Sequence, residues 1–433
     1  MKSPQHKLQA LVFGVCALYF LAVGGYKASH YSPDFMPVYT GSRCLLHGCN
    51  PYDIPQLQQQ YFLAGGLARQ LPKWKNEPPV YPPSTFLVVS PLTFLSWPAA
   101  RTLWGVMNGL LLIAAAVLIV GVCPCSYRWL ATVLASLAFL MSASNILALG
   151  QPATFAIALL AIGVILFVQG RYLPLAAVLM TLSLAVKPQI GGLIVLYFLV
   201  KRIHWRYATL AFAGAAVILL ISVLLLHLNP AAMHWTSDLR ENIARSVAPG
   251  AANDPRPAHR GGVDFANLQA ITSIFFADPK MFNLAAYVIF LIALAVFIVA
   301  TLKTDVNADS DRQIHYAAIA SLSAISLLPV YHRVYDARVL LLAIPAIVVV
   351  HQRQRLLGMI LAVVAIFQVL SMYTQGLVLS FFENRGEMPH LLQNKLLFLL
   401  TMRQGAYAVL ILAVLLLSSM FFIGRSTSRP AES

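Results

Sequence analysis

The sequence predicts an all-α polytopic membrane protein, with about 12 transmembrane helices and outer-face loops that carry short interfacial helices. Hydrophobic residues make up 59% of the chain and charged residues 10%, and the mean hydropathy is +0.74. This composition excludes an ordinary soluble globular protein. The net charge of +15 is explained by Lys and Arg beside the membrane, because the chain has no concentrated basic run of the kind that binds nucleic acid.

Apolar stretches long enough to cross a bilayer, about 20 residues with wide tolerance, recur along the whole chain. We therefore expect residues 1–433 to form a single integral membrane domain. No small-residue cleavage site follows the first stretch, so we expect a retained helix rather than a signal peptide. The expected spans are 8–26, 99–122, 129–142, 152–168, 172–186, 190–200, 207–226, 281–301, 315–328, 339–350, 356–373 and 404–423.

Two apolar regions depart from this pattern. The stretch 84–95 is short and lies between prolines, so we expect an interfacial or partly inserted helix. The two spans within 172–200 are also short, and their apex, Lys187-Pro188-Gln189, is expected to dip into the membrane.

The short loops predict the orientation. With the N-terminus inside, each short inner connection carries at least one basic residue, and 201–206 is strongly basic. Both chain ends then lie inside, and the long loops 29–82, 228–265 and 374–403 lie outside. The polar clusters of the sequence also fall on this outer face, which suggests a site there.

Asp34 lies just past the first span, beside Pro33 and Phe35, in a chain that holds only 15 acidic residues. A carboxylate at the membrane boundary is well placed to act on a lipid-borne substrate. The alternative is that Asp34 only caps a short interfacial helix, since Asp is a common helix start.

Three cationic or titratable side chains could hold a phosphate. Lys187 lies at membrane depth, where a cation needs a partner, which could be a protein carboxylate or a lipid phosphate; it could also extend to the headgroups. Arg333 offers donors that match phosphate oxygens, and His332 could donate to a phosphate or a sugar hydroxyl. The alternative for this cluster is an internal pair of Arg333 with Asp336.

Amide and aromatic side chains accompany these charges on the outer face. Asn145 and Gln151 could hold sugar hydroxyls or cap helices. Tyr52 and Tyr81 could stack on a sugar or an isoprenoid, or belong to an interfacial aromatic belt.

Cys44 and Cys49 lie close together in the first long loop. Two cysteines and His47 fall short of a four-ligand zinc site, so a local disulfide is the favoured interpretation if the loop lies outside the cytoplasm.

An ordered set of short motifs resembles glycosyltransferase family 87, the polyprenol-phosphate-mannose-dependent mannosyltransferases of the GT-C superfamily. The resemblance extends from about Asp34 to Arg338. Its motifs are Asp34-Phe35, Asn50-Pro51-Tyr52, Tyr81-Pro82-Pro83, Trp104, Gly150-Gln151, Lys187-Pro188-Gln189 and Pro329 with His332.

The resemblance implies a GT-C fold in a bacterial plasma membrane, with the active site on the periplasmic face. A polyprenyl-phosphate sugar, mannose by expectation, would be transferred with inversion to a lipid- or glycan-linked acceptor, with Asp34 as general base. Lys187, His332 and Arg333 would bind the donor phosphate. The residues expected to bind sugar or acceptor are Asn50, Tyr52, Tyr81, Asn145, Gln151 and Gln189.

No cofactor is expected, and no metal, because the first loop has no D-x-D pair. The expected partners are the lipid donor, the acceptor and membrane lipids, without nucleic acid. Two other classes remain open: a transporter or flippase of lipid-linked sugars, and a polymerase or ligase of surface polysaccharide. Related inverted halves, a common feature of transporters, are not evident.

Overall fold

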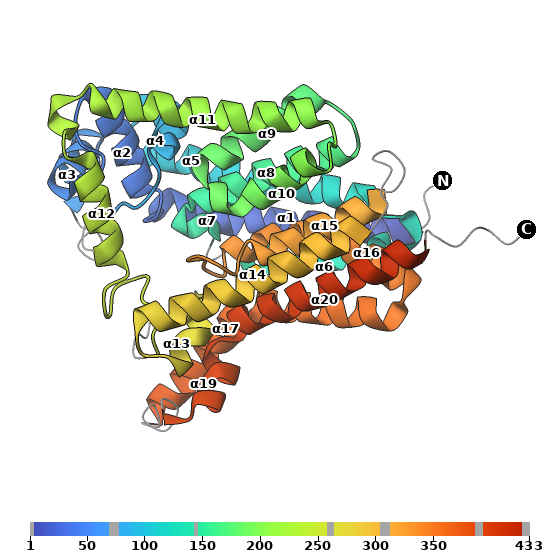
Figure 1. Cartoon of the computed structure of the whole chain (residues 1–433). Coiled ribbons are helices and arrows are strands. Elements are labelled where there is room, and N and C mark those ends of the chain that lie inside the picture. Colours follow the sequence, from blue (N-terminus) through green and yellow to red (C-terminus); the bar gives the residue numbers. More distant parts are fainter. Residues whose placement is uncertain are drawn as a thin grey trace, which may run out of the picture.

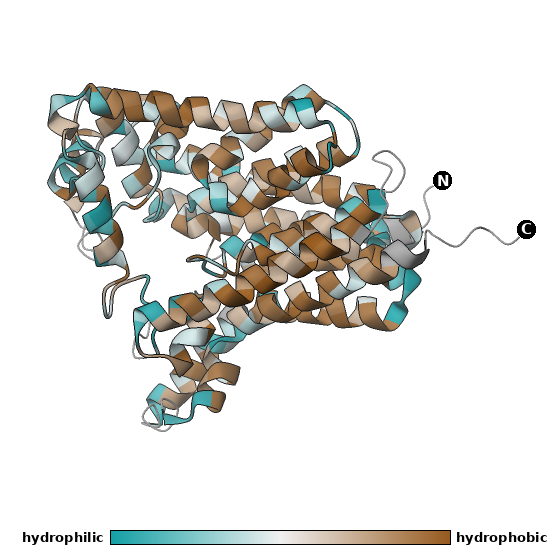
Figure 2. Cartoon of the chain, viewed as in Figure 1, coloured by the Kyte–Doolittle hydropathy of each residue, from teal (hydrophilic) through white to brown (hydrophobic). Residues whose placement is uncertain are grey.

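The computed structural model describes residues 4–68, 78–142, 146–257, 264–303, 312–385 and 393–426 as a bundle of helices (Figure 1). Apolar residues cover most of the long helices, and hydrophilic residues gather at the helix ends and connections (Figure 2). The helices expected to span are α1 (Pro4–His30), α5 (Trp97–Val122), α6 (Arg128–Ser142), α8 (Pro152–Val168), α9 (Leu173–Val186), α10 (Pro188–Val200), α11 (Trp205–His227), α14 (Pro279–Lys303), α15 (Arg312–Ile325), α16 (Ile344–Arg353), α17 (Arg355–Asn384) and α20 (Gln404–Ser426).

Six helical segments in the described ranges are long and apolar enough to cross a membrane, or up to seven if the bent α17 is one span. α8, α9 and α10 are apolar but shorter. The chain is thus a multi-pass membrane protein. The expected span 339–350 divides between a 3-10 helix (Asp336–Ala343) and α16, and each of the other expected spans overlaps one α-helix. The count of twelve spans remains a prediction, because several of these helices are short.

The connections carry shorter helices. α2 (Met36–His47) and α3 (Ile54–Leu63) lie in the first long loop, and α12 (Trp235–Ser246) in the second. They gather at one end of the bundle, opposite the start of α1 and the end of α20 (Figure 1). The others are α4 (Pro83–Val89), α7 (Ile146–Leu149), α13 (Gln269–Phe275), α19 (Lys395–Met402), and the 3-10 helices η3 (Ser90–Phe94), η4 (Cys125–Tyr127), η5 (Pro230–Ala232) and η7 (Asp336–Ala343).

The third long connection is more helical than expected. α17 does not end at 373 but continues to Asn384, with a bend of 52° between Ser371 and Tyr373. α19 then fills part of the remaining segment. The second half of α17 is apolar, which accounts for the continued helix. No proline in the sequence marks the bend, so the sequence pattern could not predict it.

α8 is the central helix of the bundle. Nearly all of its side chains are buried, as expected for a helix that is hydrophobic on every side. It packs against α5, α9 and η7. Because α8 begins at Pro152, the residue before it, Gln151, is held at the N-terminal end of the best-packed helix.

The break between α9 and α10 is stabilised by another loop. Pro188 cannot continue the hydrogen-bond pattern of α9, so the last carbonyls of α9 need other partners. The Ser84 hydroxyl donates to the carbonyl of Ala185 over 2.6 Å, and the Thr85 hydroxyl to that of Val186 over 3.0 Å. The start of α4 therefore holds Lys187 in place.

Candidate active site

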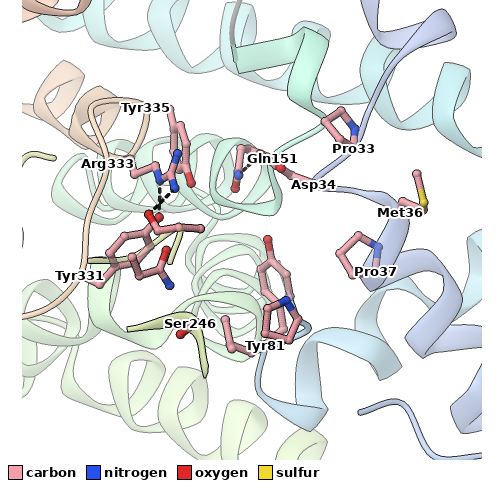
Figure 3. Close-up of a pocket in the computed structure, with 14 residues that line it drawn as sticks. Pro33, Asp34, Met36, Pro37, Tyr81, Gln151, Ser246, Tyr331, Arg333 and Tyr335 are labelled. Carbon is pink, nitrogen blue, oxygen red and sulfur yellow. Dashed lines mark hydrogen bonds between the residues drawn. The ribbon is translucent and has the colours of Figure 1, made fainter. Parts of the chain in front are cut away.

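A pocket of about 110 Å³ lies where the loops around α2, α4, α8, α12 and η7 meet. Asp34 and Gln151 lie on one side, Arg333, Tyr331 and Tyr335 on another, and Tyr81 and Ser246 near a third (Figure 3). The pocket thus brings together polar side chains from distant parts of the chain. An acid and a guanidinium face the same small volume, which is suited to a substrate that loses a proton at one end and gains charge at the other.

Asp34 is half-buried in a turn that backbone hydrogen bonds fix to the end of α7. The Ser32 amide donates to the carbonyl of Ala148 and the Asp34 amide to that of Leu149, each over 2.9 Å. The Gln151 side-chain amide also donates to Asp34 Oδ2. The carboxylate is therefore oriented from two directions, as a catalytic acid or base needs to be.

Gly150 allows this close approach. Its φ is +68°, and a Cβ there would lie 2.9 Å from the Cβ of Phe35 and 3.0 Å from that of Ser32. The indole N–H of Trp104 donates to the Gly150 carbonyl over 2.8 Å, and the Trp104 ring stacks on Phe35 at 4.6 Å. The resemblance motifs Asp34-Phe35, Trp104 and Gly150-Gln151 thus form one contiguous structure.

Lys187 and His332 converge on a buried carboxylate. Lys187 Nζ lies 2.6 Å from Asp336 Oδ1, and His332 Nδ1 lies 3.0 Å from Asp336 Oδ2. Asp336 and His332 are fully buried, and the Lys187 side chain is 12% exposed. Of the partners considered for Lys187, the structure provides the protein carboxylate.

Electrostatics in this group follow from burial and pairing. Burial raises the pKa of Asp336, but Lys187 and then His332 outweigh that effect and lower it to about 2. Burial lowers the pKa of His332, which favours the neutral ring. Because Asp336 is ionised and can only accept, the single N–H of a neutral His332 belongs on Nδ1.

Arg333 is held by three oxygen atoms from different segments. Its Nε donates to the Tyr331 hydroxyl, Nη2 donates to the Ala252 carbonyl over 2.9 Å, and Nη1 lies 3.7 Å from Asp264 Oδ2. The alternative interpretation, a pair of Arg333 with the Asp336 side chain, does not form; the backbone amide of Arg333 contacts that carboxylate, at 3.3 Å. Arg333 lines the pocket, and its side chain is 19% exposed.

The segment before α13 fixes the loop that carries Arg333. Phe265 and Arg333 form an isolated antiparallel bridge, in which the Ala266 amide donates to the His332 carbonyl over 2.8 Å. The Val334 amide donates to the Asp264 carbonyl over 2.7 Å. The second long loop therefore positions the guanidinium.

Of the residues expected to bind sugar or acceptor, Tyr81 and Gln151 line the pocket. Asn50 and Tyr52 lie outside its lining and are buried at 2% exposure. The side chain of Asn50 donates to Asp238, and the Tyr52 hydroxyl donates to the Tyr81 carbonyl over 2.8 Å. These two residues join the loops that carry the pocket.

The other expected residues are placed as follows. Gln189 is exposed near the start of α10 and outside the pocket lining. Asn145 lies outside the described residues. Cys44 and Cys49 are joined by a disulfide with their Cα atoms 4.5 Å apart, which closes the turn after α2. Across the described ranges, no group of three or more His, Cys, Asp or Glu side chains could hold a metal ion.

The pocket lining also includes Tyr331, Tyr335 and Ser246, to which the sequence assigned no role. The two tyrosines lie on either side of His332-Arg333 in the sequence, and this proximity could have indicated that they belong to the site. Burial raises the pKa of Tyr331 to about 12, so its hydroxyl stays protonated at neutral pH. Ser246, at the end of α12, had no signal, because its place depends on how the second long loop crosses the bundle.

The structure thus defines a multi-pass membrane protein with a polar pocket at one end of its helical bundle, lined by an oriented carboxylate and a guanidinium. The model of glycosyltransferase family 87 matches residues 80–308, more than half of the chain, and the chain belongs to this family. It is therefore a membrane glycosyltransferase. No curated protein and no solved structure matches the chain.

The matched range contains Tyr81, Gln151 and Lys187 but neither Asp34 nor Arg333. The pocket unites residues from inside and outside that range. Roles for Asp34 and Arg333 thus depend on the geometry of the pocket.

Proposed function

We propose that this glycosyltransferase moves a sugar, mannose, from a polyprenyl-phosphate donor to a hydroxyl of a lipid- or glycan-linked acceptor. The observation that carries the proposal is Asp34, held by Gln151 and facing the same pocket as Arg333. A hydroxyl acceptor needs a base, and a lipid phosphate leaving group needs a cation.

In the proposed reaction, the Asp34 carboxylate takes the proton of the acceptor hydroxyl. The acceptor oxygen forms a bond to the anomeric carbon as the bond from that carbon to the phosphate oxygen breaks. The configuration is inverted, and the lipid phosphate leaves with the bonding electrons. One carboxylate suffices because phosphate is a good leaving group, in contrast to the paired carboxylates of glycoside hydrolysis.

Arg333 would bind the departing phosphate. Asp264 is 3.7 Å from its guanidinium, a loose contact that a phosphate could replace with charge-assisted hydrogen bonds. Lys187 and His332 would support this site by holding Asp336, and Lys187, at 12% exposure, could share its charge with the phosphate. Tyr81 and Gln151 would contact the sugar or the acceptor.

The setting we propose is the bacterial plasma membrane, with the pocket on the periplasmic face. The disulfide Cys44–Cys49 supports an oxidising side for the first long loop. The basic short connections at the opposite end of the bundle support the same orientation.

The test is sugar transfer by the purified full-length protein in detergent, with a radiolabelled polyprenyl-phosphate mannose and a glycolipid extract as acceptor. Labelled acceptor and free polyprenyl phosphate, formed in equal amounts, would support the proposal. A protein that binds the donor but forms neither product would support a transporter instead. Nucleotide sugar supplied in parallel would show whether the lipid phosphate is required.

A further inference from the structure

A second cleft of about 40 Å³ lies between α6, η7, α16 and α17, apart from the Asp34 pocket. Its walls are apolar, and its lining includes Leu134, Ile347 and Ala365. Two polar side chains also line it: Arg338 from η7 and Gln368 from α17. The proposed transfer reaction uses neither of them.

Arg338 is 5% exposed, and the Ser142 hydroxyl accepts from its Nε over 2.7 Å. Within the described ranges, no ion pair joins a carboxylate to Arg338. Gln368 is 2% exposed, and its Nε2 has no hydrogen-bond partner among the described residues. A buried cation and a buried amide donor without an acidic partner are costly, unless an anion occupies the cleft.

The cleft has a polar end and an apolar end. Arg338 contacts Ser142, the last residue of α6, and α6 ends on the side of the bundle where the site loops lie. From Arg338 the chain runs away from that side to Ile347, while Leu134 lies two turns back along α6. An amphiphile with a charged head and an apolar chain would match this order.

We propose that this cleft binds a membrane lipid through its phosphate, with Arg338 and Gln368 holding the phosphate oxygens and the apolar walls holding the chain. A guanidinium fits phosphate because its planar fork donates to two oxygens at once. The half-buried Leu137, Ile366 and Val369 line the cleft on its more exposed side, where a chain would enter from the bilayer. The binding does not require the chemistry at Asp34.

The test is native mass spectrometry of the full-length protein with three added lipids: undecaprenyl phosphate, dioleoylphosphatidylglycerol and dioleoylglycerol. The first two carry a phosphate, and the third has the same chains as the second without one. We expect binding of at least one phosphate lipid and little of dioleoylglycerol. Preference for undecaprenyl phosphate would assign the site to a polyprenyl lipid, and preference for phosphatidylglycerol would assign it to a membrane phospholipid.

Arg338→Gln should weaken that binding roughly tenfold to a hundredfold, the usual worth of charge-assisted hydrogen bonds. Ala365→Phe, which fills the cleft but keeps the charge, should do the same and decides the matter if Arg338→Gln does not fold. Arg353→Gln, in exposed surroundings at the far end of α16, is the matched control and should bind as the parent does. Parental binding by folded Ala365→Phe, or equal binding of dioleoylglycerol, would overturn the proposal.

Discussion

Lys187 and Asp336 form an ion pair of 2.6 Å, although 149 residues separate them in the sequence. The pair joins the break between α9 and α10 to the start of η7. Asp336 also holds His332, so the loop that carries Arg333 is fixed to the centre of the bundle. Against the effect of burial, Lys187 and His332 lower the pKa of Asp336 to about 2, so its carboxylate is ionised at neutral pH.

Removal of one member of this pair should destabilise the protein. Lys187→Met leaves Asp336 buried without its cation, and such losses cost about 3–5 kcal/mol. We expect a lower unfolding temperature in detergent, measured by intrinsic fluorescence. The double variant Lys187→Met with Asp336→Asn should recover most of the loss, since it removes both charges while the Asn side-chain oxygen can still accept from His332 Nδ1. If the unfolding temperature of the double variant stays as low as that of Lys187→Met, the unpaired Asp336 charge is not the cause of the loss.

The same double variant separates structure from donor binding. If Lys187 only holds Asp336, the recovered protein should retain a near-parental KM for the lipid donor. If Lys187 also shares its charge with the donor phosphate, KM should stay raised although the fold has recovered.

Arg333→Gln should weaken use of the donor. The variant loses charge-assisted hydrogen bonds worth about 1.5–3 kcal/mol, which corresponds to a roughly tenfold to hundredfold rise in donor KM or fall in kcat/KM. Steady-state transfer at varied donor concentration measures this. Arg245→Gln is the control, because Arg245 is exposed on α12 and pairs with Glu241 on the same helix. Equal donor kinetics for the two variants would show that Arg333 does not bind the donor phosphate.

Gly150→Ala should displace the Asp34 turn. The added Cβ would meet Phe35 and Ser32 at about 3 Å in a left-handed backbone, which alone costs roughly 1–2 kcal/mol. We expect kcat to fall more than donor binding, because the carboxylate moves and the phosphate ligands do not. Gly192→Ala is the control, since a Cβ there meets nothing within 4 Å. Parental kcat in a folded Gly150→Ala variant would contradict the role of this close approach.

The orientation can be tested with single cysteines in a protein whose free Cys16, Cys123 and Cys125 are replaced by serine. Cysteines at Arg171 and His204 should be shielded from an impermeant thiol reagent in intact cells, and one at Ala251 should react. These positions lie in two short connections and in the second long loop. The reverse labelling pattern would place the pocket on the inner face.

The helices were predictable from the sequence because apolar length and proline breaks determine them. Pro188 ends α9, and the apolar run from 152 onward gives the buried α8. The bend in α17 and its continuation to Asn384 were not predictable, because they depend on packing rather than on composition.

The candidate site was predictable in its residue types but only partly in their roles. Asp34, Gln151 and Arg333 line one pocket, as their polarity at a membrane boundary suggested. Asn50 and Tyr52 are also polar, yet they are buried between loops, where Asn50 contacts Asp238 and Tyr52 contacts the Tyr81 carbonyl. Such contacts join positions far apart in the chain, and no local pattern encodes them.

Asp34→Asn is the decisive variant for the proposed role of Asp34 as general base. Asn keeps the size of Asp, and its side-chain oxygen can still accept from Gln151, but it cannot take a proton. Asn caps helices as well as Asp does, so the variant should fold. If capping were the only role of Asp34, sugar transfer would also be preserved. Asp53→Asn is the matched control, because Asp53 caps α3 by accepting from the Gln56 amide.

The measurement is kcat for sugar transfer by folded Asp34→Asn at saturating donor. If Asp34 is the general base, kcat should fall by roughly two to four orders of magnitude, the usual worth of general base catalysis, with donor binding retained and Asp53→Asn near the parent. Transfer by Asp34→Asn at close to the parental rate would contradict this role.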